Sequence, residues 1–156
     1  MKQLTMPNRR DSFKQILTLA GMLASAGYPQ FALAAYNKAA FETKSVNEAI
    51  KLQGGNAISE SKDVLINAPD YAENGAAVAL GVSTLLPGVR KLLILIEKNP
   101  ATLAASFQVS DAVESNFSTR VKMSQTSDVF VVAILSDGRA LFAKKEVKVT
   151  IGGCGA

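Results

Sequence analysis

The 156-residue chain contains no histidine, no tryptophan and a single cysteine. The absence of histidine excludes Ser-His and Cys-His dyads, histidine metal sites and the commonest general base. No glycine-rich phosphate loop lies between an expected strand and an expected helix, and no cysteine cluster has metal-ligand spacing. The sequence therefore predicts no cofactor and no metal. An enzyme built on this chain would have to work with one thiol and no imidazole.

The beginning of the chain has the three parts of an export signal. Arg9 and Arg10 form a basic region, and residues 16–26 form an apolar stretch. The sequence Ala-Leu-Ala at 32–34 offers small side chains at the spacing that a signal peptidase needs. We therefore expect residues 1–34 to be a signal peptide that is removed after export.

The paired arginines resemble a twin-arginine (Tat) signal, although Ser12 stands where that motif usually has a large apolar residue. A single membrane anchor is the alternative, but the apolar stretch is short for the roughly 20 residues of a span. We expect export to the periplasm by the Tat pathway. Residues 1–34 hold four of the 17 basic and one of the 13 acidic side chains, which leaves 13 and 12 and a net charge of +1. This balance argues against nucleic-acid binding.

Residues 36–53 predict an amphipathic helix, because Val46 and Ile50 belong to an apolar set at helical spacing. Ser45 could equally cap a shorter helix that begins there. Glycines at 54–55 end the helix in either case. We expect its apolar side to pack on the core of the domain.

After residue 60 the pattern changes to short strands separated by turns. The turn signals include ENG at 73–75, LPG at 86–88 and DG at 137–138, the last being the strongest hairpin signal. Seven or eight strands at about ten-residue spacing are typical of an antiparallel β-sandwich of immunoglobulin type. The predicted fold is all-β: an immunoglobulin-like antiparallel β-sandwich with an N-terminal helix over 35–151, followed by a flexible C-terminal tail.

Two expected strands, residues 92–96 and 129–135, are unbroken apolar runs. A sandwich strand with one wet face should alternate, so both faces of these strands need cover. Irregular packing within the chain and a second protein lying on the sheet both remain open. A separate set of cations on two other strands predicts a solvated face: Arg120, Lys122, Lys144, Lys145 and Lys148.

The chain ends in TIGGCGA, which places its only cysteine, Cys154, among glycines. The last strand is expected to end near Ile151, and residues 152–156 are expected to form a flexible arm because glycine makes order costly. Fully extended, five residues reach about 17 Å. A catalytic cysteine needs a fixed orientation, a base and oxyanion donors, so the arrangement favours a thiol that other proteins load and unload.

Three alternatives remain for this thiol. Residues 152–156 could be a free tail without a role. The chain could be a thiol-disulfide or peroxidase-type redox protein of the cell envelope, which would need an activated cysteine and usually a resolving partner. It could also be a structural envelope protein that Cys154 merely dimerises.

The terminal GGCGA resembles the GGCGG arm of the SoxY family, the sulfur-carrier subunits of the thiosulfate-oxidising Sox system. Four longer segments resemble SoxY in family order: residues 65–82, 94–107, 118–129 and 145–155. The resemblance implies that Cys154 is the carrier cysteine, which binds substrate covalently. It implies that the arm glycines are Gly152, Gly153 and Gly155. Ala156 departs from the usual final glycine.

The resemblance also implies a non-enzymatic carrier that forms a heterodimer with SoxZ, itself a β-sandwich. SoxXA, a c-type cytochrome pair, would conjugate thiosulfate oxidatively to the cysteine, and the hydrolase SoxB would release sulfate. A sulfur dehydrogenase, where present, would oxidise the remaining sulfane sulfur. SoxZ would be a candidate cover for the two apolar runs, and no membrane association is expected after cleavage of the signal.

Overall fold

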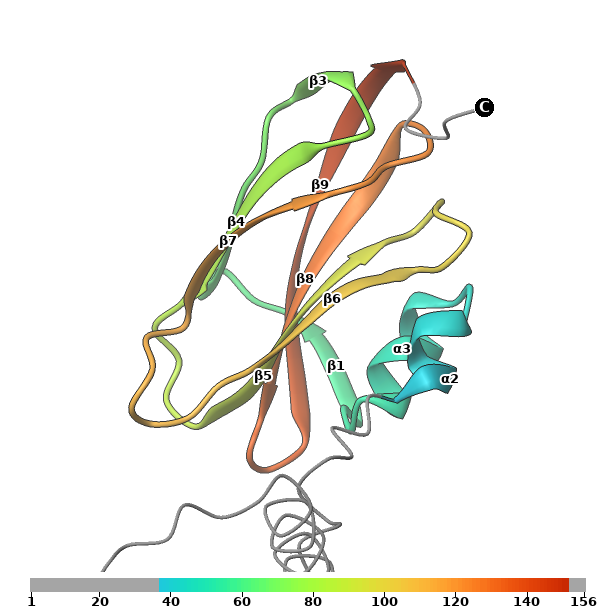
Figure 1. Cartoon of the computed structure of the whole chain (residues 1–156). Helices are drawn as coiled ribbons and strands as arrows, with labels where there is room; N and C mark the ends of the chain where they lie inside the picture. Colours follow the sequence, from blue (N-terminus) through green and yellow to red (C-terminus); the bar gives the residue numbers. More distant parts are fainter. Residues whose placement is uncertain (1–36, 152–156) are drawn as a thin grey trace, which may run out of the picture. The chain divides into compact units, whose positions relative to one another are not determined.

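Two β-sheets pack face to face, and two short helices lie against the outer face of the larger sheet (Figure 1). The structure, a computed structural model, describes residues 37–151. The helices are α2 (Lys38–Glu42) and α3 (Val46–Leu52). The strands are β1 (Ala57–Glu60), β2 (Val64–Asn67), β3 (Tyr71–Asn74), β4 (Val78–Thr84), β5 (Val89–Ile96), β6 (Leu103–Gln108), β7 (Asn116–Val121), β8 (Ser127–Leu135) and β9 (Arg139–Ile151).

The larger sheet has the order β1-β9-β8-β5-β6, with β3 pairing additionally with β9, and the smaller sheet has the order β2-β4-β7. Strands β1 and β3 run parallel to β9, and the other pairings are antiparallel. The predicted immunoglobulin-like β-sandwich is confirmed. The prediction missed β1 and β3, because each has four residues and three of them are exposed, which leaves no hydrophobic pattern to detect.

The central strands β5 and β8 are buried on both faces. Leu92 and Ile94 pack between the two sheets, whereas Leu93 and Leu95 pack with Ile50 of α3 on the outer face. All five side chains are at most 1% exposed, and each such burial stabilises the fold by about 1.5–3 kcal/mol. The two apolar runs are therefore covered by the chain's own helices and smaller sheet. They do not by themselves require a second protein.

The prediction of one continuous helix over 36–53 is wrong, because the chain breaks between α2 and α3. Thr43 Oγ1 donates a hydrogen bond to Glu48 Oε2 at 2.6 Å, and Ser45 Oγ accepts one from the Glu48 N–H at 3.4 Å. Ser45 thereby satisfies one free N–H group of a new helix start, and Thr43 Oγ1 also accepts a hydrogen bond from the Ser45 N–H at 3.2 Å. The alternative start at Ser45 is confirmed, and α3 ends before Gly54, which has a φ of +100°.

The turn predictions have mixed outcomes. Gly88 and Gly138 have φ values of +71° and +85°, as turns at LPG and DG require. The ENG turn was placed too early, because Glu73 and Asn74 still belong to β3 and the turn begins at Gly75. Within residues 37–151, no helix is both long and apolar enough to cross a membrane.

Gly55 allows the helices to lie close to the sheet, and its replacement should loosen them. A Cβ there would lie 2.6 Å from Ile50 Cγ2 and 3.0 Å from Ala140 Cβ. Gly55→Ala should lower the free energy of unfolding by about 1–3 kcal/mol, measured by denaturant unfolding. Gly81→Ala is the control, because its Cβ would meet Asn67 Cβ at a milder 3.3 Å. Equal losses in the two variants would contradict this account.

Candidate functional site

The site residues predicted from the sequence lie beyond the described part of the chain. They are Cys154, Gly152, Gly153, Gly155 and Ala156, and the predicted signal peptide also lies outside residues 37–151. The structure does show the strand from which the C-terminal segment leaves. That strand, β9, ends at Ile151, three positions before Cys154.

Strand β9 changes neighbours along its length (Figure 1). Its first part lies between β1 and β8, and its pairing with β8 ends where Val147 meets Ser127. After Val147 the strand pairs with β3, in which Lys148, Val149 and Ile151 have partners. On the other side of β9, the N–H of Val149 donates to Thr126 Oγ1 at 3.0 Å. The root of the C-terminal segment is thus held by one four-residue strand, one hydroxyl group and the half-buried side chain of Val149, which packs against the core.

A lysine fastens this short strand to β9. Lys145 Nζ donates a hydrogen bond to the carbonyl of Ala68 at 2.6 Å and lies 2.9 Å from Asp70 Oδ1. The N–H of Lys148 donates to the carbonyl of Asp70 at 3.0 Å, and its ammonium group lies 5.3 Å from the centre of the Tyr71 ring. The side chains of positions 145 and 148 point to opposite faces of β9. We call the group of Lys145, Ala68 and Asp70 the lysine clamp.

The predicted solvated row of cations is wrong at Lys145. Four of the five cations are exposed as predicted: Arg120, Lys122, Lys144 and Lys148. Lys145 instead has a side chain that is 35% exposed, on the face of β9 that also carries Val147 and Val149. Sequence reasoning grouped it with the others by charge. Its even spacing from Val147 and Val149 was the signal that it faces inward.

The clamp changes the acidity of its carboxyl group. The pKa of Asp70 lies below the usual aspartate range, first because Lys145 donates a hydrogen bond to it and then because the charge of Lys145 stabilises the carboxylate. The charge of Lys148 adds a smaller lowering. Because the Asp70 side chain is 77% exposed, salt screens these effects.

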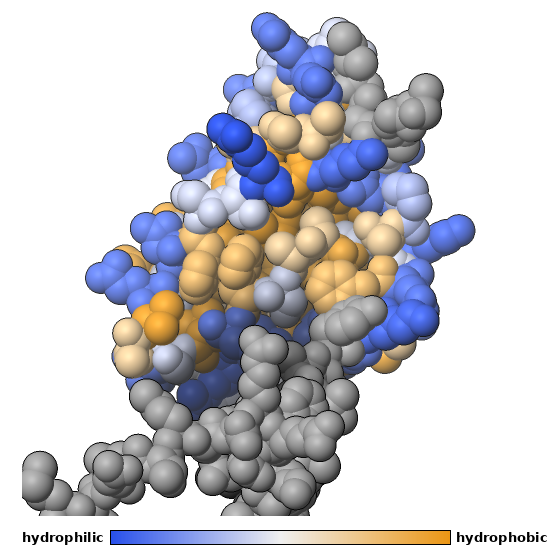
Figure 2. Space-filling view, viewed as in Figure 1, coloured by the Kyte–Doolittle hydropathy of each residue, from blue (hydrophilic) through white to orange (hydrophobic). Residues whose placement is uncertain are grey.

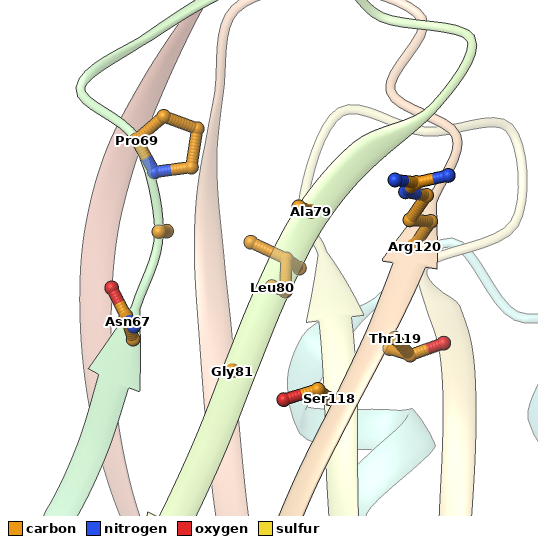
Figure 3. Close-up of a pocket in the computed structure, with 9 residues that line it drawn as sticks. Asn67, Pro69, Ala79, Leu80, Gly81, Ser118, Thr119 and Arg120 are labelled. Carbon is orange, nitrogen blue, oxygen red and sulfur yellow. The ribbon is translucent and has the colours of Figure 1, made fainter.

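An open hollow of about 660 Å³ lies on the smaller sheet (Figure 3). Its lining comes from three segments: residues 67–69, 79–81 and 118–120. Arg120 is the charged group of this lining, which contains no pair of acid and base. Among the described residues, no three His, Cys, Asp or Glu side chains could together hold a metal ion. One wall, residues 67–69, leads into the connection that the lysine clamp holds.

Lys145→Met should raise the pKa of Asp70 toward the ordinary aspartate value, because it removes the two largest causes of the lowering. In the parent protein, the stability that Asp70 contributes is present above its unfolded-state pKa and is lost as pH falls through its lower folded-state pKa. An acid titration of the Asp70 carboxyl carbon by NMR measures the difference. Lys144→Met, which changes the neighbouring exposed lysine, is the control. Equal Asp70 pKa values in the parent and in Lys145→Met would contradict the clamp geometry.

Comparison with known proteins gives a consistent result. The family model of the sulfur oxidation protein SoxY matches residues 49–154. The solved structure of the sulfur carrier protein SoxY from Chlorobium limicola f thiosulfatophilum is similar, with a TM-score of 0.61 and 37% identity over 67% of this chain and 96% of that one. No curated protein matches the sequence.

Two more distant structures share the fold. A variant of the superoxide reductase (neelaredoxin) from Ignicoccus hospitalis has a TM-score of 0.52 and 15% identity, covering 69% of this chain and 99% of that one. A putative superoxide reductase from Thermotoga maritima has a TM-score of 0.50 and 12% identity, covering 60% and 94%. At such identities the likeness concerns the sandwich alone. The family match, in contrast, spans more than half of the chain and ends on its only cysteine, and the chain belongs to the SoxY family of sulfur oxidation proteins.

Proposed function

We propose that this protein is a periplasmic sulfur carrier that holds thiosulfate-derived intermediates covalently on Cys154. The observation that carries the proposal is the position of this sole cysteine, three residues past the end of β9 and at the last residue of the family match. The similar protein from Chlorobium limicola is itself a sulfur carrier. The predicted Tat-type signal in residues 1–34 supports a periplasmic location.

Loading of the carrier forms a sulfur–sulfur bond. The Cys154 thiolate and thiosulfate join as Cys–S–S–SO₃⁻, and the two electrons released pass to a c-type cytochrome pair of the SoxXA kind. Water then cleaves the bond between the sulfane sulfur and the sulfonate group in a SoxB-type hydrolase. Sulfate and two protons leave, and a persulfide stays on Cys154. A sulfur dehydrogenase, where present, would oxidise that sulfur further.

This chain's share of the chemistry is attachment and presentation. The thiol supplies the bond to the cargo, and the glycines on both sides of it leave the tip narrow enough to enter another protein's active site. The sandwich supplies a stable body, because its core strands are buried on both faces. The catalytic groups then belong to the enzymes that receive the tip.

Intact-mass measurement of protein from thiosulfate-grown cells should find thiosulfonate or extra sulfur adducts, all of them on Cys154. Cys154→Ser should remove the adducts and abolish thiosulfate-dependent turnover when the protein is combined with its Sox enzymes. The melting temperature should stay unchanged, because position 154 lies past the last strand. A bare Cys154 thiol throughout turnover would overturn the carrier function.

We further propose that a SoxZ-type β-sandwich subunit binds the outer face of the larger sheet beside the helices. Phe130 and Phe142 are half-buried there, with ring centres 5.8 Å apart, and Ile58 packs against the same cluster. On the side of the molecule seen in Figure 2, apolar side chains gather between charged ones. A desolvated aromatic centre with a polar rim is the usual anatomy of a protein interface.

Co-expression with a SoxZ-type protein should give a soluble 1:1 complex. Phe142→Glu should weaken that complex by more than about tenfold, because it places a charge at the centre of the interface. Leu85→Glu is the matched control, since Leu85 is 99% exposed in the turn between β4 and β5 and should tolerate the charge without loss of binding. Thermal unfolding of both variants checks that they fold. Unchanged binding by a folded Phe142→Glu protein would exclude this face.

A further inference from the structure

We propose that Lys145 is a positioning residue: through the lysine clamp it fixes the point at which the chain leaves the sheet, and so sets the working length of the arm that presents Cys154. This inference rests on the proposed carrier function. It assigns a role to a side chain that lies six residues before the end of β9.

The first step is that the end of β9 depends on β3. Beyond Val147 the pairing with β8 has ended, and Lys148, Val149 and Ile151 are in register with β3. The hydroxyl of Thr126 adds one further bond, to the N–H of Val149. If β3 separates, residues 148–151 keep only the Thr126 bond and the partly buried side chain of Val149 to hold them in an extended strand.

The second step is that β3 has little of its own to hold it. It is four residues long, and of these side chains only Ala72 is buried. An alanine contributes a small apolar area, so hydrophobic burial fastens this strand weakly. Edge segments with few buried contacts are the parts of a fold that open locally.

The third step is that Lys145 forms polar bonds to the chain just before β3. Its face of β9 otherwise carries Ala143, Val147 and Val149, which pack against the core. A lysine at such a position buries its stem and carries its ammonium group outward. Here that group reaches the Ala68 carbonyl and the Asp70 carboxylate, which directly precede β3. The clamp therefore holds the chain where it crosses from the smaller sheet to β9.

The consequence for the arm follows from its length. With β9 intact, Cys154 lies three residue steps beyond Ile151, a reach of about 10 Å. With residues 148–151 released, Cys154 lies seven residue steps beyond Val147, a reach of about 23 Å. For a body docked so closely on a partner enzyme that the short arm already spans the distance to the reacting group, the effective concentration of the tethered thiol falls roughly as the −3/2 power of tether length. Release would therefore lower delivery of the thiol about three- to four-fold.

The test compares Lys145→Met and Asp70→Asn with Lys144→Met in the full mature chain paired with its partner subunit. Lys144 is the matched control, because it lies on the same strand and forms an exposed ion pair at 3.8 Å with Asp128 of β8, away from β3. Since it also lies opposite Phe130, a 1:1 complex with the partner subunit is verified for every variant first. Amide hydrogen exchange at residues 148–151 reports on release of the root. Thiosulfate-dependent turnover with the Sox enzymes reports on delivery. Alkylation of Cys154 by iodoacetamide reports on the thiol itself.

In Lys145→Met and in Asp70→Asn, the amide hydrogens of residues 148–151 should exchange several-fold faster than in the parent protein. Thiosulfate-dependent turnover should fall about three- to four-fold. Their alkylation rates and melting temperatures should match those of Lys144→Met. Lys145→Arg should restore turnover, because a guanidinium can bond the same two oxygens. Insertion of four Gly/Ser residues between Ile151 and Gly152 should reproduce the turnover loss with the clamp intact.

Normal turnover in Lys145→Met despite fast exchange at residues 148–151, or normal turnover in the insertion variant, would overturn the positioning role while leaving the carrier function in place. Unchanged exchange in Lys145→Met would overturn it too. Failure of the carrier function has a separate signature, which is sulfur-dependent turnover that survives Cys154→Ser.

Discussion

Strand β9 connects the core of the sandwich to the segment that bears Cys154, and the pairing of its last residues with β3 is the interaction on which that connection depends. Upstream, β9 lies between β1 and β8, and Val147 is completely buried. Downstream, it pairs with a strand that is mostly exposed. The change from a well-buried to a weakly held backbone therefore occurs within a few residues of the thiol. A carrier needs this boundary to be sharp, because its body must stay folded while its tip is handled by other proteins.

The body owes its stability to strands that are covered on both sides. The smaller sheet covers one face of β5 and β8, and the two helices cover much of the other. The two apolar runs in the sequence thus correspond to strands that lie inside the molecule and are covered on both faces. The helices do not cover the whole outer face of the larger sheet. Phe130 and Phe142 are half-buried beside them, and this is where we propose that a partner subunit binds.

The sequence predicted those features that leave a periodic or conformational mark. The sandwich followed from the alternation and spacing of its strands, and glycines at 88 and 138 marked turns that require positive φ. The helix break at Thr43 was less visible, because it depends on side chains bonding the backbone of the next turn. Strand β3 left no mark, since its existence depends on a partner, β9, that lies more than 70 residues away.

The residues of the candidate site also differ in how far the sequence predicts them. Cys154 stood out by composition, because it is the only thiol and lies among glycines. Lys145 did not stand out, because a lysine in a strand with several lysines looks like one more solvated charge. Its role depends on where the β2–β3 connection passes, which only the tertiary structure places beside it. Positioning residues are in general harder to predict than the groups they position, because their chemistry is ordinary and their geometry is not local.

The electrostatics of the root suit a carrier of anions. A cation free to pair with a thiosulfonate on Cys154 would hold the loaded tip against its own body and compete with the partner enzymes. Lys145 is not free in this sense, because Asp70 compensates its charge and the Ala68 carbonyl takes a second donor. Lys148 is exposed and lies beside the Tyr71 ring, where an additional ion pair in water would contribute at most about 1 kcal/mol. Lys145 and Lys148 would thus attract the proposed anionic cargo only weakly, which leaves the point where the chain departs from the sheet as the main contribution of this region to delivery.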